Sequence, residues 1–233
     1  MEYKNQLLKG TLIKRYKRFM ADVALEDGRE VTAHCANSGS MYGIKEPGLT
    51  VYLSPADNPD RKLKFTWELV EADGGLVGCN TSIPNKLVKE ALLEKKVPEL
   101  TAYDGVKSEV KYGSQNSRID HLLTQDGLPD CYVEIKNVHM LREERLAEFP
   151  DSVTSRGAKH LEELIEMVEA GHRAVMFYLV QRMDCETFSV AKDIDPTYGE
   201  NFDKAKLAGV EMLCYDTQIT VNGIELGKKL DIV

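Results

Sequence analysis

The stretch RAVMFYLVQR at residues 173–182, with seven consecutive apolar residues, most constrains what this chain can fold into. Side chains alternate between the two faces of a strand, so a strand that is apolar on both faces must be covered on both sides. An amphipathic helix is predicted just before it, at about residues 157–169, with an apolar stripe at Leu161, Leu164, Ile165 and Val168. Together these segments predict a sheet with a buried central strand and a covering helix.

Four further elements lead up to this helix. The segment NKLVKEALLEK, residues 85–95, has an apolar stripe and follows Pro84, which favours helix initiation. Three strands are predicted after it: VKSEVKYG (106–113), SRIDHLL (117–123) and CYVEIKNV (131–138). The predicted order is therefore α-β-β-β-α-β. A short helix near residues 198–207 and a hairpin at Asn222-Gly223 are predicted to close the chain.

The first 80 residues have a different pattern. About five short strand-like stretches are separated there by DG, SGS, EPG and DGG, which indicates a small β-barrel of the OB type. The junction is placed between Gly78 and Asn85, which predicts an N-terminal OB-like barrel over residues 1–82. An αβββαβ restriction-endonuclease-like domain is predicted over residues 83–233.

Charged residues inside the apolar strand CYVEIKNV are the main functional signal. Glu134 and Lys136 share one face of that strand, and Asp120 lies on the strand before it, in the pattern D-x13-E-x-K. Carboxylates on adjacent strands can hold Mg²⁺ or Mn²⁺, and the lysine can serve a water that attacks a phosphodiester. Glu90 on the first helix is a possible additional metal ligand, with Glu109 as its competitor. A cross-strand ion pair is the alternative interpretation of the whole pattern.

A basic segment near the N-terminus is the second functional signal. The net charge of −8 belongs to residues 85–233, whereas residues 1–84 contain 11 Lys and Arg against 11 Asp and Glu. Within residues 1–84, the segment KRYKRF mixes cations with aromatic rings, which favours nucleic-acid binding through Lys14, Arg15, Lys17 and Arg18. An ordinary solvated face is the alternative. The polar stretch from His34 to Ser40 is interpreted mainly as a turn.

Several classes of protein are disfavoured. The five cysteines are scattered without a CxxC pair, so neither a disulfide framework nor a cysteine zinc site is expected. The sequence contains no HExxH, GxSxG or GxxxxGK[ST] motif, which leaves zinc protease, serine hydrolase and P-loop functions without support. Neither a signal peptide nor a membrane-spanning apolar run is present, so a cytoplasmic protein without a membrane partner is expected.

The chain also resembles a known family along nearly its whole length. The resembling segments are LIKRYKRFMADV, VTAHCANSGSM, RKLKFTWELVE, VKYGSQNSRIDHLL, CYVEIKNV, FPDSVTSRGAKHLEEL and IDPTYG. They are similar to the bacterial and archaeal sugar fermentation stimulation proteins. The resemblance implies an OB-like domain, a nuclease-like domain and DNA binding. Asp120, Glu134 and Lys136 match the PD-(D/E)xK nuclease pattern, although Ile119 replaces its proline.

Two functions are therefore expected as alternatives. The first is a DNA-binding protein with a Mg²⁺- or Mn²⁺-dependent nuclease site formed by Asp120, Glu134 and Lys136. The second is a non-catalytic DNA-binding regulator of sugar-utilisation genes of the maltose type. Intact Asp, Glu and Lys positions favour the first. The preferred nucleic-acid structure and the oligomeric state stay open.

Overall fold

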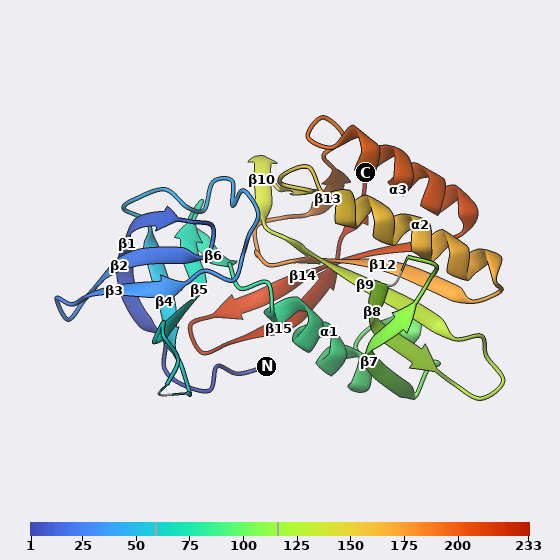
Figure 1. Cartoon of the computed structure of the whole chain (residues 1–233), viewed down its shortest axis with the longest axis horizontal. Coiled ribbons are helices and arrows are strands. Elements are labelled where there is room, and N and C mark those ends of the chain that lie inside the picture. Colours follow the sequence, from blue (N-terminus) through green and yellow to red (C-terminus); the bar gives the residue numbers. More distant parts are fainter. Residues whose placement is uncertain (59, 116) are drawn as a thin grey trace.

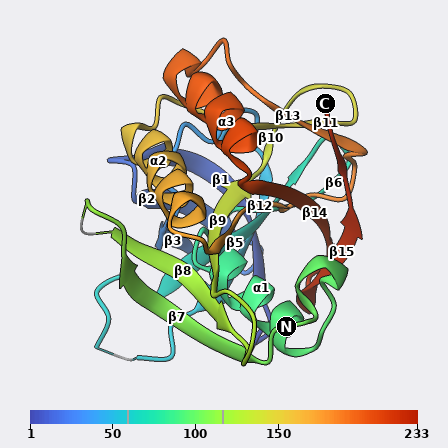
Figure 2. The same ribbon diagram turned by 90° about the vertical axis from the view of Figure 1, so that its right-hand side faces the viewer.

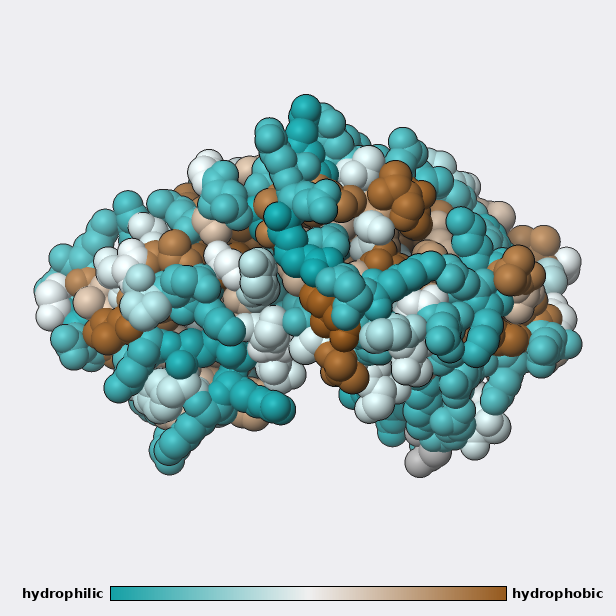
Figure 3. Space-filling model, turned by 90° about the horizontal axis from the view of Figure 1, so that it is seen from above, coloured by the Kyte–Doolittle hydropathy of each residue, from teal (hydrophilic) through white to brown (hydrophobic). Residues whose placement is uncertain are grey.

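The structure is a computed structural model that describes residues 1–58, 60–115 and 117–233. Figure 1 shows two lobes, with the N-terminal strands on the left and the helices with the larger sheet on the right. Among the described residues, no helix is long and apolar enough to cross a lipid bilayer. The face seen in Figure 3 is hydrophilic over most of its area, with small scattered apolar patches.

The N-terminal lobe is a closed OB barrel, as predicted. Its strand order is β3-β2-β1-β4-β5-β6, and an additional pairing of β3 with β5 closes the barrel. Trp67 is fully buried in the barrel core, and its indole donates to the Leu69 carbonyl at 3.0 Å. The strands are β1 (Leu8–Tyr16), β2 (Met20–Leu25), β3 (Glu30–His34), β4 (Thr50–Pro55), β5 (Phe65–Ala72) and β6 (Gly75–Gly78).

The C-terminal lobe is a mixed α/β domain built on a six-stranded sheet in the order β15-β14-β12-β9-β8-β7. The β9, β12 and β14 strands are parallel to one another, and β7, β8 and β15 pair antiparallel with their neighbours. The strands of this sheet are β7 (Gly105–Tyr112), β8 (Ser117–Thr124), β9 (Cys131–Val138), β12 (Arg173–Val180), β14 (Glu211–Thr220) and β15 (Gly223–Lys229).

Helices cover both faces of this sheet, as the stretch RAVMFYLVQR requires. On one face α1 (Ile83–Leu93) packs with Val175, Phe177 and Leu179 of β12. On the other face α2 (Ser155–Glu169) and α3 (Pro196–Ala208) pack with the alternate β12 residues, including Met176 and Tyr178. Figure 2 shows α2 and α3 lying side by side over that face. The 3₁₀ helix η1 (Pro98–Leu100) follows α1.

A second, smaller sheet was not predicted. It has the order β10-β11-β13-β16, with strands β10 (Met140–Glu143), β11 (Leu146–Phe149), β13 (Thr187–Val190) and β16 (Asp231–Ile232). None of these strands exceeds four residues, so the sequence pattern of each is too short to separate it from a loop. Two strands of the small sheet, β10 and β11, lie between β9 and α2 in the chain. The segment that follows them, residues 149–154, lies against the barrel.

Candidate functional site

The β8 and β9 strands bring Asp120 level with Glu134. Their antiparallel register pairs His121 with Val133 and Leu123 with Cys131, and one further step along that register places Asp120 opposite Glu134. The Asp120 carboxylate accepts the Ile135 backbone N–H at 2.7 Å and the Asn85 side-chain amide of α1 at 2.6 Å. Asp120 is thus held by a neighbouring strand and by a helix.

Glu134 lies at the centre of a buried charged group. Its side chain is 3% exposed, and the Lys136 ammonium donates to its Oε1 at 2.8 Å. The Nδ1 atom of His160, on α2, contacts the same Oε1 and lies 3.1 Å from Lys136 Nζ. The other oxygen, Oε2, is buried without a hydrogen-bond partner in the described structure. Because an unpartnered buried anionic oxygen is costly, Oε2 is an open ligand position.

The two carboxyl groups are pushed toward opposite protonation states. Burial, and then the charge of Glu134, raises the pKa of Asp120 to about 7. Burial also disfavours the ionised form of Glu134, but Lys136 and His160 outweigh it and lower the pKa of that carboxyl below its ordinary value. Near neutral pH Glu134 is therefore ionised and Asp120 is only partly so. A divalent cation would favour ionisation of both.

Sequence reasoning missed Glu163 and Tyr112. Glu163 is fully buried on α2, and both of its carboxylate oxygens lack a partner among the described residues. A Cβ atom at Gly113 would lie 2.8 Å from Glu163 Oε1, so the glycine leaves room for this carboxylate. Burial, followed by the charges of Glu134, Glu163 and Asp120, raises the pKa of Tyr112. The i, i+3 spacing of His160 and Glu163 was the available sequence signal.

Glu90 and Glu109 lie outside this charged group. On a helix, residues five positions apart are separated by about 140°, so when Asn85 faces Asp120, Glu90 faces elsewhere. Its carboxylate instead accepts from the N-terminal ammonium of Met1 at 2.7 Å. Glu109 is exposed and has a φ of +57°, opposite Asp120 between the Ser108–His121 and Val110–Ile119 pairs. This uncommon conformation marks a local distortion of the sheet beside Asp120.

Asp120 and Glu134 are the two candidate metal ligands of this site. Within the described part of the chain, no three His, Cys, Asp or Glu side chains are grouped so that they could hold one. Asp120 and Glu134 nevertheless supply hard oxygen atoms, including the unpartnered Glu134 Oε2. Such a pair fits Mg²⁺ or Mn²⁺, which commonly bind one or two carboxylates and complete their shell with water and phosphate oxygens.

The four cations predicted to bind nucleic acid have different surroundings. Lys14 is 3.4 Å from Asp22 and lies over the Tyr16 ring. Arg15 instead turns toward the barrel, and its Nη2 donates to the carbonyls of Asn37, Gly39 and Arg18 at 2.9–3.1 Å. Lys17 and Arg18 form the β1–β2 turn with positive φ values of 49° and 63°. Lys14 and Arg15 are therefore engaged by other groups of the barrel, whereas Lys17 and Arg18 lie at a turn.

The polar stretch from His34 to Ser40 contains the turn expected there. The Asn37 side chain accepts the backbone N–H of Gly39 at 2.8 Å, which closes a local loop. Cys35, like the other four cysteines, is buried and unbridged. The loop faces residues 149–154 of the C-terminal domain.

An OB barrel joined to a mixed α/β domain with an Asp, Glu and Lys group defines a class of nuclease-like proteins. Comparison with known families agrees: residues 13–79 match the SfsA N-terminal OB domain, and residues 82–223 match the sugar fermentation stimulation protein RE domain. The chain belongs to the sugar fermentation stimulation protein family.

Relatives of this family match the chain over almost its full length. The homolog from Dinoroseobacter shibae is 55% identical and covers 100% of this chain and 96% of its own. The homolog from Ruegeria sp. strain TM1040 is 57% identical over 97% of this chain and 98% of its own. The structure of Pyrococcus furiosus SfsA in complex with Ca²⁺ has a TM-score of 0.90 at 26% identity, covering 100% of this chain and 98% of that one.

Proposed function

We propose that this chain is a DNA-binding protein with a Mg²⁺-dependent site that hydrolyses phosphodiester bonds. The observation that carries the proposal is the buried Glu134 carboxylate, which has one oxygen paired to Lys136 and the other unpartnered, with Asp120 level on the adjacent strand. The similar Pyrococcus furiosus protein was solved with Ca²⁺, which supports a divalent cation in this family.

In this proposal Asp120 and Glu134 hold the cation, and water and phosphate oxygens complete its shell. The cation would supply charge compensation for the phosphate and a lower pKa for a bound water. Asn85 and the Ile135 N–H orient the Asp120 carboxylate. Lys136 has its ammonium beside Glu134, where it can stabilise the negative charge that develops on the phosphate.

His160 has a positioning role in the same proposal. Its Nδ1 contacts Glu134 Oε1, and its Nε2 accepts from Arg156 at 3.3 Å. Arg156 and His160 both lie on α2, so the helix holds the His160 ring against Glu134 Oε1, the oxygen that Lys136 also contacts. Glu134 Oε2 is thereby left available to a ligand.

A cleavage assay with variants tests the proposal. Wild type, Glu134→Gln and Lys136→Ala are incubated with Mg²⁺ or Mn²⁺ and single strands, duplexes and branched junctions. Loss of a group that assists proton transfer or stabilises charge typically costs ~10²- to 10⁴-fold, so both variants should cut at least about 100-fold more slowly. Glu90→Gln is the matched control and should cut like wild type. Equal cleavage by all four proteins would refute the assignment.

A non-catalytic DNA-binding regulator of sugar-utilisation genes is the second candidate. The observation in its favour is that Lys136 is already neutralised by Glu134 and that no third ligand is grouped with the two carboxylates in the described chain. Under this function, purified wild type would bind DNA but cut none of the substrates with either cation.

A further inference from the structure

A cleft of about 710 Å³ lies between the barrel and the C-terminal domain, away from Glu134 and Asp120. The barrel contributes Arg15, Arg18, Ser40 and Lys45, and the loop before α2 contributes Ser152 and Thr154. The described lining residues thus include three cations, against the carboxylate of Asp151. Asp151 is engaged by the Met41 N–H at 2.9 Å and lies 3.3 Å from His139. The excess charge of the cleft is positive.

Buried hydrogen-bond donors accompany these cations. The Arg15 Nε, the Ser40 Oγ and the Asn37 Nδ2 are all buried without partners in the part of the chain that is described, and Asn37 is 3% exposed. Three backbone carbonyls fix the Arg15 guanidinium in place but do not neutralise its charge. Fixed, unneutralised donors beside further cations are suited to a phosphate group.

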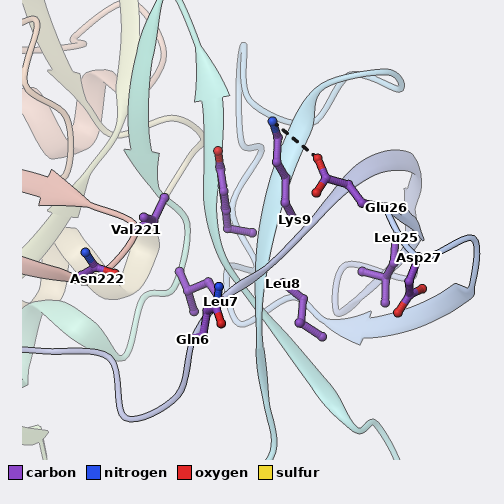
Figure 4. Close-up of a pocket in the computed structure, with 10 residues that line it drawn as sticks. Gln6, Leu7, Leu8, Lys9, Leu25, Glu26, Asp27, Val221 and Asn222 are labelled. Atoms are coloured by element: carbon purple, nitrogen blue, oxygen red, sulfur yellow. Dashed lines mark ion pairs between the residues drawn. The ribbon is translucent and has the colours of Figure 1, made fainter.

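The pocket in Figure 4 provides a contrast on the same barrel. It has a volume of about 450 Å³ and is lined by Lys9, Glu26 and Asp27, among others. Lys9 and Glu26 form an ion pair at 3.7 Å across its wall, drawn as a dashed line in Figure 4. Acidic residues outnumber the cation there, so that pocket is unsuited to an anion.

The helix α2 runs from the edge of the cleft to the candidate catalytic residues. Thr154 lines the cleft and caps α2 by accepting the Gly157 N–H at 3.0 Å. His160, which contacts Glu134, is six residues further along, or about 9 Å at the helix rise of about 1.5 Å per residue. Phosphates of one strand follow each other every ~3.4 Å along a duplex axis, so a few nucleotides can span that distance.

We propose that this cleft binds a backbone phosphate of a nucleic-acid strand, held by Arg15, Arg18, Lys45 and Ser40. The proposal deepens the DNA-binding function proposed above and rests on it. It assigns the loop from His34 to Ser40 a role in recognition and adds Lys45, which lies outside the basic segment. It also places the affinity at the boundary between the two domains, so that the barrel presents the strand to the site on β8 and β9.

Binding of a fluorescently labelled single-stranded oligonucleotide, measured by anisotropy in EDTA across salt concentrations, tests this inference without requiring cleavage. The variant Arg18→Ala/Lys45→Ala removes two cleft cations and spares Arg15, whose bonds hold the loop. The matched control Lys4→Ala/Lys9→Ala removes two charges of the same domain that are paired with Asp57 and Glu26. Thermal unfolding checks that both variants are folded.

The cleft variant should bind at least about 10-fold more weakly, and its salt slope should fall by about 0.7, because one phosphate contact on a single strand contributes about 0.7. The control should change little. A further variant, Ser40→Glu, should weaken binding by placing a negative charge among the donors.

Three outcomes would overturn the inference. Equal weakening in the cleft and control variants would mean that only total charge matters. Unchanged oligonucleotide binding in the cleft variant would exclude the cleft, even if wild type cleaves DNA. Binding of millimolar inorganic phosphate that the cleft variant loses, while its oligonucleotide affinity equals that of wild type, would indicate a site for free phosphate. Conversely, cleft-dependent binding by a protein that never cuts would support the inference and refute the nuclease.

Discussion

Two buried charged groups in this molecule are organised differently. Arg182, whose side chain is 2% exposed, donates to Asp184 at 2.7 Å, to Asp73 at 2.8 Å and to the His139 carbonyl at 2.9 Å. Glu134 is equally buried at 3%, but one of its oxygens has no partner in the described chain, and the pKa of the nearby Asp120 is raised to about 7. The first group is saturated and the second is incomplete.

This difference in hydrogen bonding identifies the Arg182 group as a structural contact and the Glu134 group as a candidate functional site. Arg182 forms an isolated β-bridge with Val77 of β6, and Asp73 is in the β5–β6 turn of the barrel. The bonds of Arg182 therefore join the two domains. A buried charge with complete bonding leaves no group available to a ligand. The group around Glu134 keeps an open oxygen and mutually repelling carboxyls, which a cation can relieve.

The largest expected effect comes from breaking the saturated group. Arg182→Ala should lower the free energy of unfolding by about 3 kcal/mol, because it removes a buried partner and leaves two carboxylates near the domain contact. Urea denaturation measures this. Arg145→Ala, which removes an exposed ion pair with Glu186, is the control and should change stability by less than about 1 kcal/mol. If both variants changed the free energy of unfolding equally, the buried Arg182 group would contribute no more to stability than an exposed ion pair.

The next largest effect concerns the incomplete group. Asp120→Asn should weaken Mg²⁺ and Mn²⁺ binding by at least about 100-fold, since loss of even a supporting residue commonly costs about 10- to 100-fold. Titration calorimetry measures it, and Glu90→Gln, whose carboxylate faces Met1, should bind like wild type. If Asp120→Asn bound both cations as wild type does, the incomplete group would not be a metal site.

Without metal, the same substitution should stabilise the fold. The pKa of Asp120 rises from 3.8 to about 7 on folding, so its ionisation opposes folding, increasingly between pH 4 and 7 and fully above that range. Asp120→Asn in EDTA should therefore raise the free energy of unfolding at pH 8 by about 2 kcal/mol, given about 1.4 kcal/mol per pKa unit and partial exposure. Near pH 4 the gain should disappear. A loss of stability at pH 8 would contradict the conclusion that ionised Asp120 destabilises the folded protein.

The smallest expected effect concerns Asp151, which forms a second contact between the domains by accepting the Met41 N–H. Burial disfavours the charged form of Asp151, but His139, the Met41 N–H and Ser152 outweigh it and lower its pKa to about 2. The stabilisation is present above the unfolded value of 3.8 and is lost as pH falls toward 2. Asp151→Asn should cost about 1–2 kcal/mol at pH 7 and less at pH 3, by thermal unfolding. A cost that did not shrink at pH 3 would contradict an ionic origin.

The long periodic elements could be predicted because their patterns extend over many residues. Alternate β12 residues contact the two opposite cores, as RAVMFYLVQR indicated. The predicted α2 stripe was also found, although the helix begins at Ser155 rather than Gly157. The small sheet was not predicted from the sequence, because its strands of two to four residues are stabilised by their neighbours rather than by their own sequence.

The sequence by itself determined which charges lie on β8 and β9, since strand alternation and the spacing of Asp120, Glu134 and Lys136 follow from local order alone. The tertiary structure decided what surrounds them. Asn85 rather than Glu90 meets Asp120, and the Glu163 carboxylate lies buried opposite Gly113. These contacts join residues tens of positions apart, and their geometry depends on how α1 and α2 dock on the sheet, which no local pattern encodes.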